Sequence, residues 1–139
     1  MPLNKVTIMQ VKNYQEVPAN DVTMAGAAGC RVRWLVGERD MARTFAMREF
    51  EVAPGGHTPK HFHDYEHEVY VLAGRGTIVD GDRERPLNAG DVVFIAPNDV
   101  HQFRNTGSEP MRFLCLIPNS ATGKNVAVVP ECGLETSST

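Results

Sequence analysis

Residues 55–74 read G-G-H-T-P-K-H-F-H-D-Y-E-H-E-V-Y-V-L-A-G and contain four of the five histidines of this 139-residue chain. Among them, His61, His63 and His67 fall within seven positions. Side chains at positions i and i+2 of a strand project to the same face, so His61 and His63 can reach one point. The interval D-Y-E then allows a turn or bulge before the run H-E-V-Y-V-L. Either His67 or Glu68 can return to that point, but strand alternation prevents both from facing inward.

Alternation favours His67 over Glu68. If His67 faces the interior, Val69 and Val71 face it too, and Glu68 points away. If Glu68 faced the interior instead, Tyr70 would also turn inward. We therefore predict that His67 joins the other two histidines.

A second stretch, residues 90–105, reads G-D-V-V-F-I-A-P-N-D-V-H-Q-F-R-N and places His101 at the start of another strand. A lone histidine is usually an ordinary hydrogen-bonded residue, and an H-x-H pair is also weak by itself. Four imidazoles that converge on one point are a metal-site arrangement, because histidine is the commonest transition-metal ligand. The fifth histidine, His57, lies in a G-G-H-T-P turn and is not expected to be a ligand. The joint pattern predicts one metal site with four ligands: His61, His63, His67 and His101.

The composition is that of one globular domain, with 42% hydrophobic and 22% charged residues and a net charge of -3. The sequence has no run of Lys or Arg that would form a basic patch, so neither nucleic acid nor an anionic membrane is expected as a partner. The apolar runs are strand-sized and the N-terminus has no signal-peptide core, so a cytoplasmic location is expected. Three cysteines without C-x-x-C spacing make a disulfide framework or a thiolate zinc site unexpected.

Short apolar or alternating runs recur along the chain, separated by Gly, Pro, Asn and Asp, and helical periodicity is hard to find. Strands of this length with turn signals between them predict an all-β sandwich or barrel. Pro54-Gly55-Gly56 predicts a break after the third run. The predicted strands are Val6–Val11, Val32–Val36, Thr44–Val52, Glu68–Ala73, Gly76–Val79, Asp91–Ile95, His101–Asn105 and Met111–Ile117.

The two histidine stretches together resemble the two motifs of the cupin superfamily. The first motif is G-x5-H-x-H-x3-H-x6-G, from Gly55 to Gly74, and the second covers residues 90–105. The resemblance implies a single conserved cupin barrel (a double-stranded β-helix or jelly roll) whose histidines hold one metal ion inside. This sequence departs from the usual motifs at His67, where cupins usually have Glu, and at Asn98, where they usually have Gly. Asn tolerates the left-handed backbone that Gly often supplies, so that turn is expected to survive.

The histidine set and the segments around it are similar to a compact bacterial subgroup, the four-histidine manganese cupins. The flanking segments are L-V-G-E-R-D-M-A-R-T-F-A-M-R-E-F and F-L-C-L-I-P, so the likeness runs from about Arg31 to Pro118. It implies a homodimer, capacity for oxidative chemistry, and a site for Mn²⁺, with Fe²⁺, Zn²⁺ or Ni²⁺ as alternatives. The chain would divide into an N-terminal strand or arm at 1–30 that could pack on the partner subunit, a cupin barrel at 31–118 and a C-terminal tail at 119–139.

The run F-A-M-R-E-F-E-V offers one charged candidate for the pocket. Arg48, Phe50 and Val52 share one face of the predicted strand, and Glu49 and Glu51 occupy the other. The inward face is therefore expected to be the apolar one, with Arg48 on it. Arg48 is either an edge arginine with a buried stem or an anion or oxyanion clamp near the metal.

Other pocket residues follow from position. Thr58, Phe113 and Cys115 resemble the pocket-lining residues of the four-histidine subgroup by their places in the chain. Phe103 lies two residues after His101 and should face inward by alternation. A cavity lined by Phe and Val favours a small apolar or aromatic substrate over a sugar.

Four neutral imidazoles leave a divalent ion its full +2 charge. An octahedral ion would keep two positions open for a small-molecule substrate, whereas the same four ligands would close the sphere of a tetrahedral zinc. The leading hypothesis is a metal-dependent oxidoreductase, dioxygenase-like, that cleaves its substrate oxidatively. The alternatives are a non-catalytic small-molecule-binding cupin and a sugar-type isomerase or lyase, which would need a polar pocket.

Overall fold

The computed structural model describes residues 9–119 and 126–128 of the chain. Two short 3-10 helices lie among the strands of one antiparallel sheet. In chain order, the elements are η1 (Tyr14–Glu16), β1 (Asn20–Asp21), β2 (Ala28–Val36), η2 (Glu38–Asp40), β3 (Phe45–His57), β4 (His61–His63), β5 (His67–Ala73), β6 (Arg75–Asp80), β7 (Arg83–Asn88), β8 (Val92–Ile95), β9 (His101–Arg104), β10 (Met111–Pro118) and β11 (Val126–Val128).

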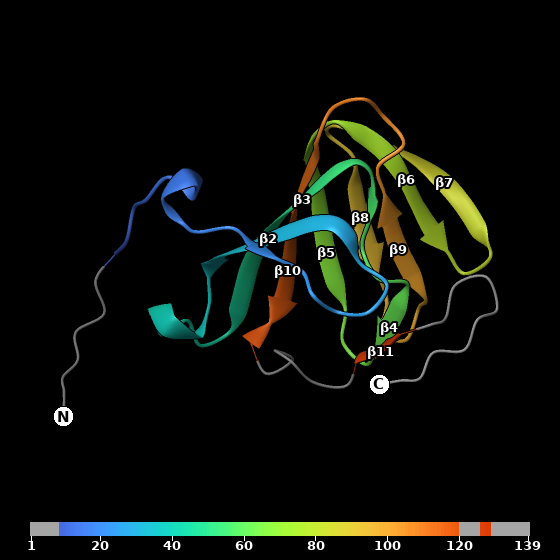
Figure 1. The fold of residues 1–139 in the computed structure, drawn as a ribbon. Coiled ribbons are helices and arrows are strands. Elements are labelled where there is room, and N and C mark those ends of the chain that lie inside the picture. The colour runs from blue at the N-terminus through green and yellow to red at the C-terminus, as the bar shows by residue number, and fades with distance from the viewer. Residues whose placement is uncertain (1–8, 120–125, 129–139) are drawn as a thin grey trace.

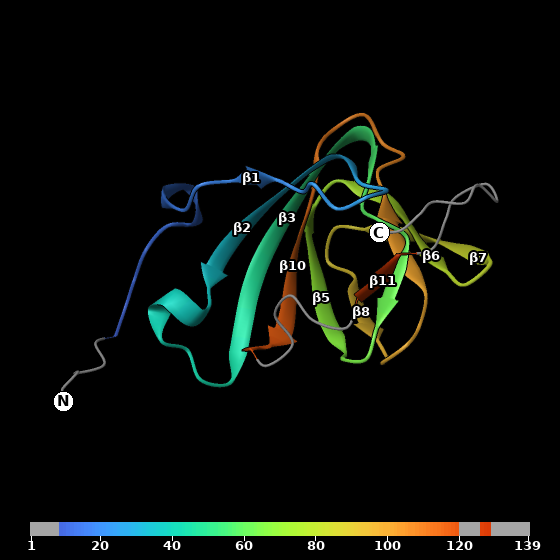
Figure 2. The same cartoon turned by 60° about the horizontal axis from the view of Figure 1, so that its bottom comes forward.

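Strand β3 is the centre of the sheet. Along most of its length it pairs with β2 on one side and β10 on the other, and the sheet continues from β10 through β5 to β8. At its end β3 pairs with β9, which also pairs with β4 and β6. The sheet therefore curls around one interior, with β5 and β8 facing β6, β7 and β9 (Figure 1 and Figure 2). The prediction of an all-β barrel is confirmed.

The break expected at Pro54-Gly55-Gly56 is wrong, because these residues lie inside β3. The strand bends there instead of ending. Gly55 has a φ of 82°, and a Cβ on Gly56 would lie 2.5 Å from the carbonyl oxygen of Ala28. Glycine permits both the left-handed backbone and the close approach, so one strand can leave the β2–β10 part of the sheet and reach β9.

Four predicted strands lie within observed ones, and three others extend one residue beyond them, at Thr44, Asp91 and Asn105. The short strands β1, β4 and β11 and the longer β7 were not among the predicted strands. Strand β7, R-E-R-P-L-N, was not predicted, because it is polar and contains Pro86. It pairs only with β6 among the described residues, and an edge strand tolerates proline. The predicted strand Val6–Val11 lies partly outside the described residues, and its described part, residues 9–11, forms no strand. None of the described helices has the length and apolar character needed to cross a membrane.

The interior of the barrel is apolar and is formed by inward-facing residues of the strands from β2 to β10, except β4. Its members are Cys30, Ala46, Val52, Val69, Val71, Ile78, Leu87, Ile95, Phe103, Met111, Phe113, Cys115 and Ile117. Cys30 and Cys115 are buried free thiols, as expected, and Cys132 lies outside the described residues. Asn98 has a φ of 71°, which confirms the expected left-handed turn, and its N–H donates to the His63 carbonyl at 2.6 Å.

The outer face of β3 holds a buried charge that the sequence did not indicate. Glu49 is only 1% exposed, although it lies on the polar face of the strand. Its carboxylate accepts from Arg33 at 2.9 Å and from Arg112 at 2.6 Å. The ring of Tyr14, from η1, lies 5.1 Å and 4.6 Å from these two guanidinium carbons. The N-terminal segment thus covers an ion-pair cluster on the outside of the barrel.

We expect Glu49→Ala to lower the free energy of unfolding by about 3 kcal/mol, because it breaks two ion pairs of a buried carboxylate and leaves Arg33 only its longer, 3.8 Å pair with Glu51. Glu51→Ala is the matched control, since Glu51 lies two residues along the same strand and is only half-buried. That control should cost about 1 kcal/mol or less, as partly exposed pairs do. Urea unfolding of both variants measures the difference, and equal losses would contradict the assigned role of Glu49.

Candidate metal centre and its pocket

The four predicted ligands meet inside the barrel. His61 and His63 come from β4, His67 begins β5, and His101 begins β9, where it pairs directly with His61. One nitrogen from each of these imidazoles lies within 4.8 Å of the others. His63, His67 and His101 are buried and His61 is half-buried. His67 and not Glu68 joins the cluster, so the alternation argument is confirmed.

Backbone carbonyls orient three of the rings. Nδ1 of His61 contacts the Pro59 carbonyl, Nδ1 of His63 that of Tyr65, and Nδ1 of His101 that of Asp99, each at 2.8 Å. A carbonyl only accepts, so each Nδ1 carries the proton, and Nε2 is left with a free lone pair. Nδ1 of His67 contacts the sulfur of Cys115 instead.

The remaining nitrogens suit a metal ion. Nε2 of His67 lies 2.5 Å from Nε2 of His63, and Nε2 of His101 is buried without a hydrogen-bond partner among the described residues. The Nε2 lone pairs of His63 and His101 are enclosed in this cluster, and a cation shared by the four rings would engage them, because a buried polar atom without a partner is costly. The four-histidine cluster is thus compatible with a divalent metal ion, and the other ring nitrogen of each ligand is already held, as in metalloproteins generally.

Burial keeps these imidazoles neutral. It lowers the pKa of His61 to about 4 and that of His101 to about 3. The pKa of His63 is lowered by the same cause, and that of His67 is lowered by burial and then by the nearby Arg48 charge. Neutral imidazole is the form that binds metal, so the cluster is ready for an ion at neutral pH.

We expect the metal-free protein to lose stability as pH falls below about 6.5. The unfolded chain then binds protons that folded His61 and His101 do not, so the free energy of unfolding falls with pH until their folded pKa values, about 4 and about 3, are reached. Urea midpoints at several pH values measure the slope. His101→Gln removes one titrating group and should flatten it, and an unchanged slope in that variant would contradict the assignment.

The cluster opens on an apolar cavity of about 490 Å³. Three of its histidines line the wall, and all five predicted pocket residues, Arg48, Thr58, Phe103, Phe113 and Cys115, line it as well. Phe113 stacks on Phe103 at 4.3 Å and on Phe50 at 5.3 Å between ring centroids. The cavity is therefore shaped for a flat or apolar molecule beside the metal ligands.

Among the described residues that line this cavity, Arg48 is the one with a permanent positive charge. Its guanidinium carbon lies 5.3 Å from the Trp34 ring centre and 4.9 Å from that of Phe50, and Nη2 donates to Cys115 Sγ at 3.1 Å. Its Nε is buried without a hydrogen-bond partner among the described residues. No ion pair joins it to a carboxylate in residues 9–119 and 126–128. A half-buried guanidinium whose buried Nε–H is a spare donor favours an anionic ligand.

The hydrogen bonds of Thr58 and His57 link neighbouring segments of the barrel. The Thr58 hydroxyl accepts from the Phe103 N–H at 2.9 Å and donates to the Pro59 carbonyl, which also holds His61. His57 is not part of the cluster, and its ring contacts the Thr58 carbonyl and the Gln102 side chain. Thr58 thus ties β9 to the segment that carries the first ligand.

Sequence reasoning missed a group of residues around the cavity. Trp34 and Val32 of β2 line it, as do Val22 and Met24 from the segment before β2. Alternation in β2 could have placed Val32 and Trp34 on one face, but no local signal brings the preceding segment over the barrel mouth. Tyr65 was also missed, and its ring stacks on His63 with centroids 4.0 Å apart.

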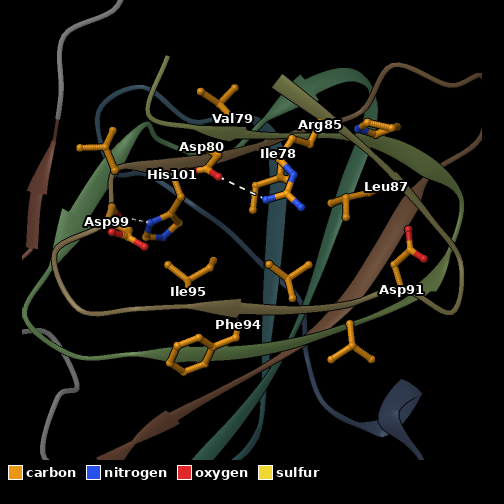
Figure 3. Close-up of a pocket in the computed structure, with 14 residues that line it drawn as sticks. Ile78, Val79, Asp80, Arg85, Leu87, Asp91, Phe94, Ile95, Asp99 and His101 are labelled. Atoms are coloured by element: carbon orange, nitrogen blue, oxygen red, sulfur yellow. Dashed lines mark hydrogen bonds and ion pairs between the residues drawn. The ribbon is translucent and has the colours of Figure 1, made fainter. Parts of the chain in front are cut away.

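A second cavity of about 350 Å³ lies between the β6–β7 hairpin and β8, and His101 lines this one too (Figure 3). Its floor is apolar, with Ile78, Leu87 and Ile95. Most of its charged groups are engaged. Asp80 pairs with Arg85 at 3.3 Å, and Asp91 accepts from the Asn88 N–H. The apolar cavity is lined by Arg48, a cation without an ion-pair partner among the described residues, and is therefore the better candidate for a ligand site.

Comparison with known proteins agrees with this geometry. Residues 48–117 match the family model described as "Cupin domain". The oxalate-binding protein of Thermotoga maritima is 32% identical over 116 residues, which cover 80% of this chain and 94% of that protein. The solved polyketide cyclase RemF of Streptomyces resistomycificus superposes with a TM-score of 0.80 at 34% identity, covering 88% of this chain and 86% of that one.

A third relative is matched over a shorter stretch. The glucose-6-phosphate isomerase of Pyrococcus abyssi is 36% identical over 84 residues, and this stretch is 55% of this chain and 44% of that protein. The family model covers half of the chain, and the oxalate-binding protein aligns over most of it. With its all-β barrel and four-histidine cluster, this chain belongs to the cupin family.

Proposed function

We propose that this cupin is a metal-dependent oxidoreductase of the dioxygenase-like kind, acting on a small apolar or aromatic molecule that carries an anionic oxygen. The observation that carries the proposal is the pairing of two features in one cavity. A cluster of four neutral imidazoles lines one wall through three of its members, and the half-buried Arg48, whose buried Nε has no hydrogen-bond partner among the described residues, lies beside it among aromatic rings. Such a site binds a charged group and an apolar body together.

His61, His63, His67 and His101 would hold the ion, most simply Mn²⁺, with Fe²⁺, Zn²⁺ and Ni²⁺ as the alternatives. A bound divalent ion of this kind supplies Lewis acidity and, for Mn or Fe, redox capacity. Four uncharged ligands leave its full charge in place, which favours an anionic substrate on electrostatic grounds.

The protein residues then bind and orient the substrate. Arg48 would take the anionic oxygen with its free donor, because Arg presents N–H groups suited to carboxylate and enolate oxygens. Phe50, Phe103 and Phe113 would take the apolar body on their ring faces. The same rings give the cavity an apolar lining next to His61 and His67. A reacting bond would thus be held against an apolar surface at the metal side of the cavity.

A redox-neutral cyclase is the second candidate, and the likeness to the polyketide cyclase RemF favours it. The same apolar cavity would fold an aromatic precursor, with the ion as a Lewis acid. The similarity to the oxalate-binding protein favours a third candidate, a protein that binds a ligand without converting it. A sugar-type isomerase or lyase is disfavoured despite the relative of that kind, because a sugar needs a polar pocket and this cavity is mostly apolar.

Oxygen consumption separates these candidates. Mn-loaded protein would be supplied with a panel of aromatic and enolic carboxylates and alkenylphenols under ¹⁸O₂. The oxidoreductase predicts one O₂ consumed for each carbon–carbon double bond broken, with both labelled atoms in the two new carbonyl groups. Conversion without oxygen and with loss of water would support the cyclase instead. Saturable binding of a compound without formation of any product would support the ligand-binding role.

The proposal includes a homodimer, for which the outer face of β5 and β8 offers a surface. Tyr70, Val92 and Phe94 project outward there and are 50%, 73% and 61% exposed. We expect wild type to run as a dimer in light scattering, and Phe94→Lys to shift it toward monomer, because a charge on a buried apolar contact is costly. Val11→Lys is the control on the N-terminal arm. If only the Val11 variant dissociates, the arm and not the β5–β8 face holds the dimer.

A further inference from the structure

His67 is held differently from the other three ligands. His61, His63 and His101 each contact the carbonyl of a residue two positions away, so their own strand ends fix their rings. Nδ1 of His67 contacts Cys115 Sγ, which lies 48 positions away on β10. The orientation of this one ligand therefore depends on a side chain from another strand.

Cys115 also contacts the cation of the pocket. Arg48 Nη2 lies 3.1 Å from its sulfur. Cys115 stands opposite Arg48 in the β3–β10 register and opposite Val69 in the β10–β5 register, and it is 2% exposed. Arg48, Cys115 and His67 thus form a line across three neighbouring strands, β3, β10 and β5, on the inner face of the barrel.

The donor and acceptor roles along this line are determined by chemistry. If His67 binds a metal through Nε2, its Nδ1 carries a proton and must donate. Arg48 has only donors. The Cys115 sulfur is therefore the acceptor shared by both groups, and a stronger acceptor for Arg48 would leave the sulfur to His67 alone. The free Nε of Arg48 indicates that its present contacts do not satisfy it.

We infer that Cys115 is a positioning residue that couples ligand binding at Arg48 to the metal ligand His67. An anion that binds the guanidinium would draw it from the sulfur, the His67–Cys115 contact would strengthen, and His67 would become a stronger donor to the ion. The inference rests on the proposed function in one respect, since it requires a metal at the four-histidine cluster. It does not depend on which reaction follows.

The test uses the full chain loaded with Co²⁺, whose visible spectrum reports ligand geometry, with benzoate as the anionic aromatic probe. In wild type, benzoate should shift the visible bands. In Cys115→Ala, benzoate should still bind but the shift should be lost, and Co²⁺ affinity should fall about 10-fold, as on removal of other outer-shell partners. Cys115→Ser keeps an acceptor and should retain most of the shift. Cys30→Ala removes the other described buried thiol and should behave as wild type.

A second measurement avoids any fold defect from cavity formation at Cys115. In Zn-loaded, ¹⁵N-labelled protein, His67→Gln identifies the Nδ1–H resonance of His67 by its loss. Arg48→Met should then move that resonance by more in the wild-type background than in Cys115→Val, which fills the space of the thiol but accepts no hydrogen bond. The comparison of backgrounds is needed because the Arg48 charge also acts on all four imidazoles through space. Equal movement in both backgrounds would mean that no effect passes through the sulfur, and that result would overturn the inference.

Failure of the inference and of the proposed function give different results. If wild type binds no metal at the cluster, both are wrong. If wild type binds metal but benzoate leaves its spectrum unchanged, or if Cys115→Ala retains both the shift and the affinity, only the coupling is wrong and the metal site stands.

Discussion

A His67→Ala protein should bind Mn²⁺ at least about 100-fold more weakly than wild type. Removing a residue that only hydrogen-bonds a metal ligand costs up to about 100-fold in metal affinity, and removing a ligand should cost at least as much. His67 is one of four histidines that the described residues bring together as candidate ligands, its ring is buried, and its Nε2 lies 2.5 Å from that of His63. No described carboxylate belongs to the cluster to replace it. After dialysis against an excess of a chelator, the metal content measured by mass spectrometry should be about one ion per chain in wild type and near zero in His67→Ala.

Glu68→Ala is the matched control for that experiment. Glu68 is the next residue, it points away from the cluster, and its contact with Glu66 raises its pKa to about 6. Because the usual cupin ligand is a glutamate, this pair of variants tests alternation directly. Loss of metal from the Glu68 variant, or full occupancy in the His67 variant, would contradict the four-histidine assignment. Zinc in every preparation, whatever metal is supplied, would indicate a closed site.

Arg48→Met should weaken the binding of an anionic aromatic ligand such as benzoate by about 10- to 100-fold. The estimate corresponds to loss of a charge-assisted hydrogen bond of roughly 1.5–3 kcal/mol. Methionine keeps much of the apolar stem between Trp34 and Phe50, so the fold should be retained. Metal stoichiometry should stay near one ion per chain, because Arg48 is not a ligand. Isothermal titration of the Mn-loaded protein with benzoate measures the loss.

Two controls make the Arg48 result specific. Arg85→Met removes the arginine of the other cavity, which is paired with Asp80, and should leave benzoate binding unchanged. Benzamide has the same ring without the charge, and its affinity should change little between wild type and Arg48→Met. Equal loss for benzoate and benzamide would mean that Arg48 shapes the cavity but does not bind the anion.

Local spacing in the sequence was sufficient for the all-β class and for the cluster of four histidines. His61 and His63 share a face because the strand period is two, and parity between His67, Val69 and Val71 placed the fourth imidazole correctly. Burial of Phe103 two residues after His101 follows from the same rule. These predictions succeeded because each needs only the direction of a side chain within its own strand.

What covers each face was decided by tertiary structure alone. Alternation placed Glu49 on the outer face of β3, but only the packing of Tyr14, Arg33 and Arg112 around it shows that this face is buried. Likewise, only the approach of the β2 backbone to Gly56 shows why that position needs a glycine, and β7 is a strand because β6 pairs with it. A local pattern contains no information about a neighbour that arrives from elsewhere in the chain.

The chemistry of the site divides in the same way. The sequence by itself determined that four imidazoles could meet and that Arg48 shares a face with Phe50. Only the register of β3, β10 and β5 places the Cys115 sulfur between Arg48 and His67, and only the segment before β2 brings Val22 and Met24 over the cavity. Contacts between strands depend on register and on the curl of the whole sheet, and these are settled when the strands pair.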